Sequence, residues 1–160
     1  NTFKNHGLVS RDNVEIFGVN SRMDTINSQI LKYRLLKLED IINRRRENVE
    51  IYRKHLNIKE VQIPICSEDE FNSFVMFIVQ AEDRDSLQNF LKSHDIESLV
   101  YYSKPLHLHT AFKNKFGNIN DLPISEKLTK KVLALPIHQH LQKEQIIYVC
   151  KKIKEFYNYP

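Results

Sequence analysis

The sequence predicts a mixed α/β domain in which a long amphipathic helix leads into a small sheet flanked by helices. Between Met23 and Leu56 there is no proline or glycine, and apolar residues recur every three or four positions. After Asn57, short apolar runs alternate with segments of helical periodicity, which is the pattern of a sheet packed against helices. At 160 residues, 41% of them hydrophobic, the chain is long enough for one domain, or one lobe of a larger protein, with its own core.

The long helix is predicted over residues 23–56. One apolar line along it is formed by Leu31, Leu35, Leu38, Ile42, Val49, Tyr52 and Leu56. Because this is longer than a usual globular helix, we expect either a bend near Lys37 or a helix that bridges two bodies. A dimer seam is a further alternative, although the heptad run is too short for a coiled coil. Arg44–Arg46 has acidic residues within helical reach, so a salt-bridged solvated face is favoured over a nucleic-acid patch.

The remaining elements are predicted from shorter patterns. Strands are expected at 14–17, 60–63, 74–79 and 96–102, and the run 74–79 is apolar enough for a strand buried on both faces. Helices are expected at 83–93 with Asp83 as its cap, from Pro123 to about Leu133, and from Lys143 to Tyr157. The buried face of the last helix would comprise Ile146, Ile147, Val149, Cys150, Ile153 and Phe156.

Charge and cysteine content narrow the functional class. The net charge of +4 permits anionic ligands without requiring nucleic acid. Cys66 and Cys150 form no CxxC pair, so neither a disulfide framework nor a zinc site is indicated, and two reduced thiols in a cytoplasmic protein are expected. No apolar run has the length of a membrane span or a signal peptide, and the first residues, which include no initiator Met, suggest a portion of a longer chain.

The stretch from Gly18 to Asp24 is a candidate anion site. Ser21 followed by Asp24 resembles a capping box ahead of the long helix, and a helix N-terminus offers free N–H groups to a phosphate. Asn20, Ser21 and Arg22 would add side-chain donors there. Spacing alone favours a simple cap, with Arg22 solvated or paired, because caps are common and bound phosphates are not.

His107 and His109 form the second candidate site. Two residues apart in an extended segment, they would face the same side and could approach a substrate or cofactor, or merely pack locally. A metal would require His138 and His140 to fold onto them, so none is expected. The chain has no glycine-rich phosphate loop, nucleophile elbow or HExxH motif, which argues against a free-standing enzyme.

Several segments, taken in order, resemble one known family. They are Asn5-His6-Gly7, Gly18-x-Asn20-Ser21-Arg22-Met23-Asp24, Arg44-Arg45-Arg46 with Tyr52, Arg84-Asp85-x-Leu87-x-x-Phe90-Leu91, Tyr102-x-x-Pro105-Leu106-His107-Leu108, Leu133-Ala134-Leu135-Pro136-Ile137-His138 and Gln145-Ile146-Ile147-Tyr148-Val149. Together they resemble the C-terminal part of the DegT/DnrJ/EryC1/StrS family of pyridoxal-phosphate-dependent sugar aminotransferases. Phe74-Val75 replaces the family's aromatic-His pair and Asp95-Ile96 its Gly-Ile, so the sugar stays undefined.

The resemblance implies the C-terminal domain of a fold-type I aminotransferase that works as a homodimer. Residues 1–22 would be a lead-in from the large domain, and residues 23–160 the small domain with its bridging helix. Members move an amino group from glutamate to a keto sugar nucleotide, in the biosynthesis of polysaccharides or deoxyamino sugars. Asn20 and Ser21 would contact the cofactor phosphate in the neighbouring subunit.

The resemblance also assigns His107 and Tyr102, with His109 and Arg22, to the sugar-nucleotide side of the site. The Schiff-base lysine belongs to the preceding domain, so this chain alone is expected to be inactive. Two alternatives stay open: a non-catalytic dimerisation or ligand-binding module with the same fold, and, more weakly, a basic nucleic-acid binder.

Overall fold

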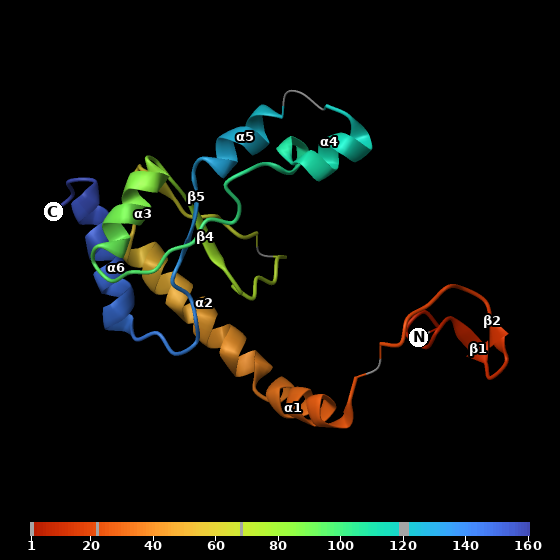
Figure 1. Ribbon diagram of the computed structural model, residues 1–160. Helices are drawn as coiled ribbons and strands as arrows, with labels where there is room; N and C mark the ends of the chain where they lie inside the picture. Colours follow the sequence, from red (N-terminus) through yellow and green to blue (C-terminus); the bar gives the residue numbers. More distant parts are fainter. Residues whose placement is uncertain (1, 22, 68, 119–121) are drawn as a thin grey trace. The chain divides into compact units, whose positions relative to one another are not determined.

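The computed structural model describes residues 2–21, 23–67, 69–118 and 122–160. Contacts divide the chain into two compact units, residues 1–39 and 40–160 (Figure 1). The described residues form helices and small sheets, which confirms the predicted α/β class.

The first unit begins with a hairpin of β1 (Leu8–Ser10) and β2 (Asn13–Val14). An antiparallel bridge between Asn5 and Asn20 closes its base. Gly7 has a φ of +77°, and a Cβ there would lie 1.6 Å from the Ile16 carbonyl oxygen, so the close backbone approach requires glycine. The strand predicted at 14–17 is wrong beyond Val14, because these residues form the return of the hairpin rather than a strand.

Helical structure then extends from residue 25 to residue 55 with one interruption. Helix α1 (Thr25–Leu35) ends at a turn formed by Leu36 and Lys37, after which α2 (Leu38–His55) begins. The interruption lies where the sequence allowed a bend. In α1 no residue is buried, whereas α2 buries Asn48, Val49 and Tyr52.

The second unit contains a three-stranded antiparallel sheet in the order β3 (Val61–Gln62), β4 (Phe77–Ala81), β5 (Val132–Leu135). Phe77 pairs with Leu135 and Val79 with Leu133, which places these four buried side chains on one face. Burial alternates along β4, so the prediction of a strand buried on both faces is wrong. The strand also starts three residues late, since Phe74 has a positive φ and Val75 and Met76 are exposed.

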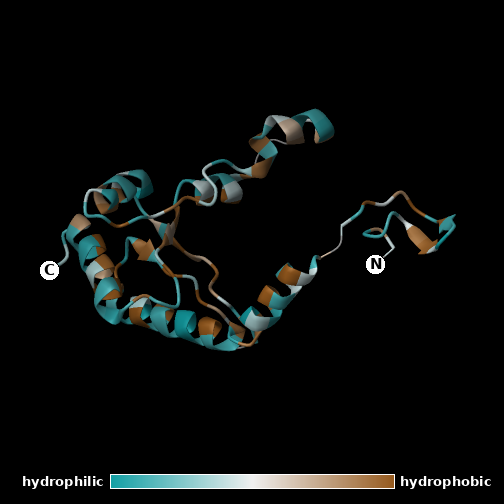
Figure 2. Cartoon of the chain, turned by 60° about the horizontal axis from the view of Figure 1, so that its bottom comes forward, coloured by the Kyte–Doolittle hydropathy of each residue, from teal (hydrophilic) through white to brown (hydrophobic). Residues whose placement is uncertain are grey.

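The hydrophobic core of the second unit includes residues from three helices: α2, α3 (Arg84–Lys92) and α6 (Lys143–Phe156). Their buried side chains cluster with the inner face of the sheet, and brown apolar bands recur along the C-terminal helix in Figure 2. On α6 the residues Ile146, Val149, Cys150 and Ile153 are buried as predicted, while Ile147 and Phe156 are half-buried. Asp83 occupies the N-cap position of α3 as predicted, but its φ is +45° and its side chain makes no capping hydrogen bond.

The segment between α3 and β5 combines irregular backbone with three short helical pieces. It contains the 3₁₀ turn η1 (Leu106–Leu108), α4 (Thr110–Phe116) and α5 (Pro123–Thr129). The strand predicted at 96–102 is reduced to one bridge, Leu99 with Ala134. The predicted helix 123–133 is wrong after Thr129, because Val132–Leu135 pairs with β4 as a strand. Among the described residues, no helix is long and apolar enough to cross a membrane.

Candidate functional site

The first predicted site residues, Asn20 and Ser21, lie at the base of the hairpin. The backbone of Asn20 bridges Asn5, and the Ser21 amide donates to the Lys4 carbonyl oxygen at 3.0 Å. Both side chains are exposed, and neither has a hydrogen-bond partner among the described residues. A free amide group and a free hydroxyl on adjacent residues are suitable donors for a phosphate.

The structure corrects the predicted cap at this site. Asp24, not Ser21, is the N-cap of α1, and its Oδ1 accepts a 2.8 Å hydrogen bond from the Asn27 amide. The Asp24 carboxylate therefore occupies the helix end, where it competes with an anion for the N–H groups of α1. A phosphate here would depend on the two side chains. Arg22 lies outside the described residues.

The second group lies in the other unit, around η1. His107 is 3% exposed, and its Nε2 lies 3.1 Å from Oε1 of Glu126 on α5. His109 is exposed and precedes α4. The prediction that the two histidines face the same side is wrong, because residues 106–108 form a 3₁₀ turn rather than an extended segment.

Tyr102 and His107 line one hollow of about 420 Å³. Its wall is largely apolar and includes Tyr101 and Phe112, with the Lys104 ammonium as the cationic member. His109 is not part of this lining. The structure thus brings Tyr102 and His107 together and leaves His109 apart. Aromatic rings beside a cation and hydrogen-bonding groups suit a ligand that has both a ring and an anionic portion.

Large pKa shifts occur in the helical core of the second unit. Burial raises the pKa of the Cys150 thiol to about 12. Burial also raises the pKa of the Tyr52 hydroxyl, with a smaller contribution from Cys150. Both groups therefore keep their protons at physiological pH.

The four histidines considered as metal ligands do not form a cluster. Within the described ranges, no group of three or more His, Cys, Asp or Glu residues could hold a metal ion. The rings of His138 and His140 lie 6.3 Å apart, and Nδ1 of His138 accepts a hydrogen bond from the His140 amide. They organise the turn after β5.

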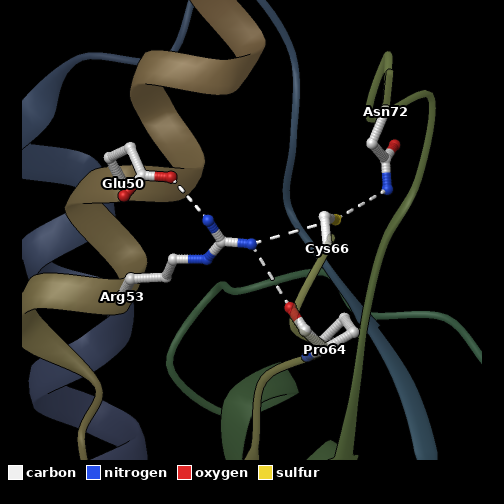
Figure 3. A network of polar contacts seen from close by, with 5 residues as sticks. All are labelled: Glu50, Arg53, Pro64, Cys66 and Asn72. Atoms are coloured by element: carbon white, nitrogen blue, oxygen red, sulfur yellow. Dashed lines mark hydrogen bonds and ion pairs between the residues drawn. The ribbon is translucent and has the colours of Figure 1, made fainter. Parts of the chain in front are cut away.

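A polar network links α2 to the segment before β4 (Figure 3). Arg53 pairs with Glu50 at 2.7 Å and donates to the Pro64 carbonyl oxygen at 3.3 Å. The Cys66 sulfur lies 4.0 Å from Arg53 and 3.6 Å from the Asn72 amide nitrogen. The arginine fixes the course of residues 64–66 along the helix.

Sequence reasoning missed Glu126, Lys104 and Phe112. Glu126 is separated from His107 by 19 residues, so no local spacing joins them. The available signal was its place in the first turn of the helix opened by Pro123. Lys104 and Phe112 flank the Pro105–Leu108 segment in sequence. No motif marks them, and their place in the lining of the hollow follows only from the tertiary structure.

Comparisons with known proteins give one consistent result. The sequence profile of the DegT/DnrJ/EryC1/StrS aminotransferase family matches residues 1–154. GDP-perosamine synthase of Escherichia coli O157:H7 is 34% identical over 98% of this chain and 43% of its own length. A dTDP-3-amino-3,6-dideoxy-alpha-D-galactopyranose transaminase of Aneurinibacillus thermoaerophilus is 28% identical over 98% of this chain and 42% of its own length.

Solved structures share the fold. DesV of S. venezuelae superposes with a TM-score of 0.89 at 29% identity, covering 97% of this chain and 42% of that one. The chain therefore spans about two-fifths of the length of the relatives it matches.

Proposed function

The chain belongs to the DegT/DnrJ/EryC1/StrS aminotransferase family, and we propose that it forms the C-terminal part of a pyridoxal-phosphate-dependent sugar aminotransferase. The amino donor would be glutamate and the acceptor a keto sugar carried on a nucleotide. The observation that carries this proposal is the family match over residues 1–154, together with relatives named for nucleotide sugars.

The cofactor phosphate would be held in part by Asn20 and Ser21. Their exposed donors have no partner among the described residues and suit a phosphate oxygen. As the family resemblance implies, this phosphate site would be shared with a second subunit of a homodimer. When bound, pyridoxal phosphate supplies the electron sink that allows an amino group to move between two carbon skeletons. The assignment of Arg22 to sugar-nucleotide binding rests on the sequence resemblance alone.

The sugar nucleotide would be bound by the hollow that Tyr102 and His107 line, with His109 at its approach. The aromatic wall can exclude water from the sugar, and the Lys104 ammonium can attract the diphosphate. The lysine that carries the cofactor is assigned to the family's large domain, beyond these 160 residues.

The test is to join this chain to the large domain of GDP-perosamine synthase in place of that enzyme's own C-terminal region. This protein, called the fusion below, is assayed with pyridoxal phosphate, glutamate and a panel of GDP-, dTDP- and UDP-linked keto sugars. We expect the fusion to form 2-oxoglutarate with at least one of them, and the 160-residue chain alone to form none. Turnover by the chain alone would refute the assignment of the nucleophile to the missing domain. A folded, cofactor-binding fusion without turnover would favour the non-catalytic module.

A further inference from the structure

The contact between His107 and Glu126 has a feature that packing alone does not require. The imidazole is nearly fully buried, whereas the glutamate side chain is 42% exposed. The two residues lie on separate elements, η1 and α5. The Nε2 atom of the buried ring thus contacts the carboxylate of a partly solvent-exposed glutamate.

The chemistry of this pair fixes where the ring proton lies. An ionised carboxylate only accepts hydrogen bonds, so at 3.1 Å the Nε2 of His107 must carry the hydrogen. In the neutral ring, Nδ1 is then the acceptor nitrogen. Because Nε2 is occupied by Glu126, any hydrogen bond from the ring to a ligand in the hollow has to use Nδ1.

We propose that Glu126 is a positioning residue that holds His107 as its Nε2–H tautomer, so that Nδ1 accepts a hydrogen bond from a sugar hydroxyl. The inference rests on the proposed function, since it names the part of the sugar nucleotide that His107 recognises. A hydroxyl matches an acceptor nitrogen, whereas a phosphate oxygen would require a donor. Glu126 therefore selects for the sugar rather than for the diphosphate.

The helix that holds Glu126 does not depend on this carboxylate. The Glu126 amide donates to the Leu122 carbonyl oxygen, and the Glu126 carbonyl oxygen accepts from the Thr129 hydroxyl at 2.9 Å. These backbone groups survive any substitution of the side chain. Glu126→Gln keeps an acceptor oxygen for Nε2–H and removes the charge, while Glu126→Ala removes the acceptor.

The first experiment needs no activity. Long-range ¹H–¹⁵N correlation spectra of the 160-residue chain report which ring nitrogen of each histidine is protonated, and His107→Gln assigns the His107 signals. We expect the Nε2–H tautomer in the unsubstituted chain and in Glu126→Gln, and a mixture of tautomers in Glu126→Ala. A His107 ring protonated at Nδ1 alone in the unsubstituted chain, or an unchanged pattern in Glu126→Ala, overturns the inference.

The second experiment uses the fusion with the keto sugar nucleotide that it turns over. Glu126→Ala is expected to raise KM for this substrate about tenfold, the usual loss for one hydrogen bond to a ligand, and Glu126→Gln to restore most of it. The affinity for pyridoxal phosphate should not change in either variant. Glu144→Ala is the matched control, because Glu144 is likewise an exposed acid in the first turn of a helix.

The two experiments separate the failure of each proposal. A KM unchanged in Glu126→Ala, or an equal loss in Glu144→Ala, contradicts the positioning role while the aminotransferase assignment stands. If the unsubstituted fusion has no activity, the proposed function fails, and the tautomer measurement still decides what Glu126 does to His107.

Discussion

The Tyr52 hydroxyl donates a 3.0 Å hydrogen bond to the carbonyl oxygen of Pro136, which lies 84 residues further along the chain. Tyr52 is fully buried on α2, and its ring centroid lies 4.9 Å from that of Phe77 on β4. The neighbouring Asn48 amide donates to the His138 carbonyl oxygen at 2.9 Å. Two side chains of α2 thus hold the backbone of the residues that directly follow β5.

Replacing Tyr52 with Phe should lower the free energy of unfolding by about 1–2 kcal/mol, because the carbonyl of the half-buried Pro136 loses its partner while the ring remains. Urea denaturation of the 160-residue chain measures this. Tyr148→Phe on the exposed side of α6 serves as the control and should change stability by less than about 0.5 kcal/mol. Equal effects of the two substitutions would show that the bond to Pro136 contributes nothing specific.

Stability should fall at alkaline pH because of Cys150. Burial raises the pKa of its thiol from 9.0 to about 12. Between these values the unfolded chain has lost the proton and the folded chain retains it, so the free energy of unfolding decreases as pH rises. One such group contributes a slope of about 1.4 kcal/mol per pH unit. Burial also raises the pKa of Tyr52, which adds a loss of the same sign at higher pH.

Urea midpoints at pH 8, 9, 10 and 11 test this expectation. Cys150→Ala is less stable at every pH because it leaves a cavity, but its slope above pH 9 should be shallower than that of the unsubstituted chain. Parallel slopes would mean that the buried thiol is not the group responsible. Cys66→Ala, at a half-buried position, is the control.

The proposed phosphate contact of Asn20 predicts a selective loss of affinity. In the fusion, Asn20→Ala should weaken pyridoxal phosphate binding about tenfold or more, because a charged acceptor loses a donor. Asn13→Ala, in the same hairpin and also exposed, should have no effect. Titration with pyridoxal, which lacks the phosphate, separates the causes: an equal loss with both ligands would contradict a phosphate contact.

The exposed apolar face of α1 predicts self-association of the 160-residue chain. Ile26, Ile30, Leu31 and Leu35 are all exposed on this helix. Apolar surface of this kind associates in water. We expect sedimentation at tens of micromolar to show species larger than a monomer, and the double variant Ile26→Lys/Ile30→Lys to be monomeric. Gln29→Lys adds a charge to the same helix without removing apolar surface, so it should still associate; a monomeric unsubstituted chain would contradict the prediction.

Helices with one strongly apolar face could be predicted almost to the residue. The bounds of α3 and α6 differ from the expected ones by a single residue at each affected end, because their periodicity is local information. The strand β5 could not be found this way. Val132–Leu135 continues the apolar pattern of the preceding helix without a Gly or Pro, and only pairing with β4 makes it a strand.

The candidate site shows the same division. The segment Pro105–Leu108 was identified, but the 3₁₀ turn that buries His107 and exposes His109 is set by what packs around it. The spacing of Ser21 and Asp24 predicts a helix start, but it does not decide which of the two residues caps the helix; in the structure Asp24 is the N-cap. Glu126 required the tertiary structure, since its partner lies on another element.

The antiparallel pairing of β4 with β5 has a consequence for the order of folding. The two strands are joined through α3, η1, α4 and α5, so the sheet closes a loop of more than fifty residues, from Ala81 to Val132. The hydrogen-bond partners of Tyr52 and Asn48 likewise lie beyond Leu135, so these bonds form only after that part of the chain is made. Such long closures make folding slow compared with that of helical bundles. During synthesis, α2 and β4 would therefore emerge from the ribosome with their apolar faces uncovered, and the lobe could assemble only after its C-terminal residues had left the exit tunnel.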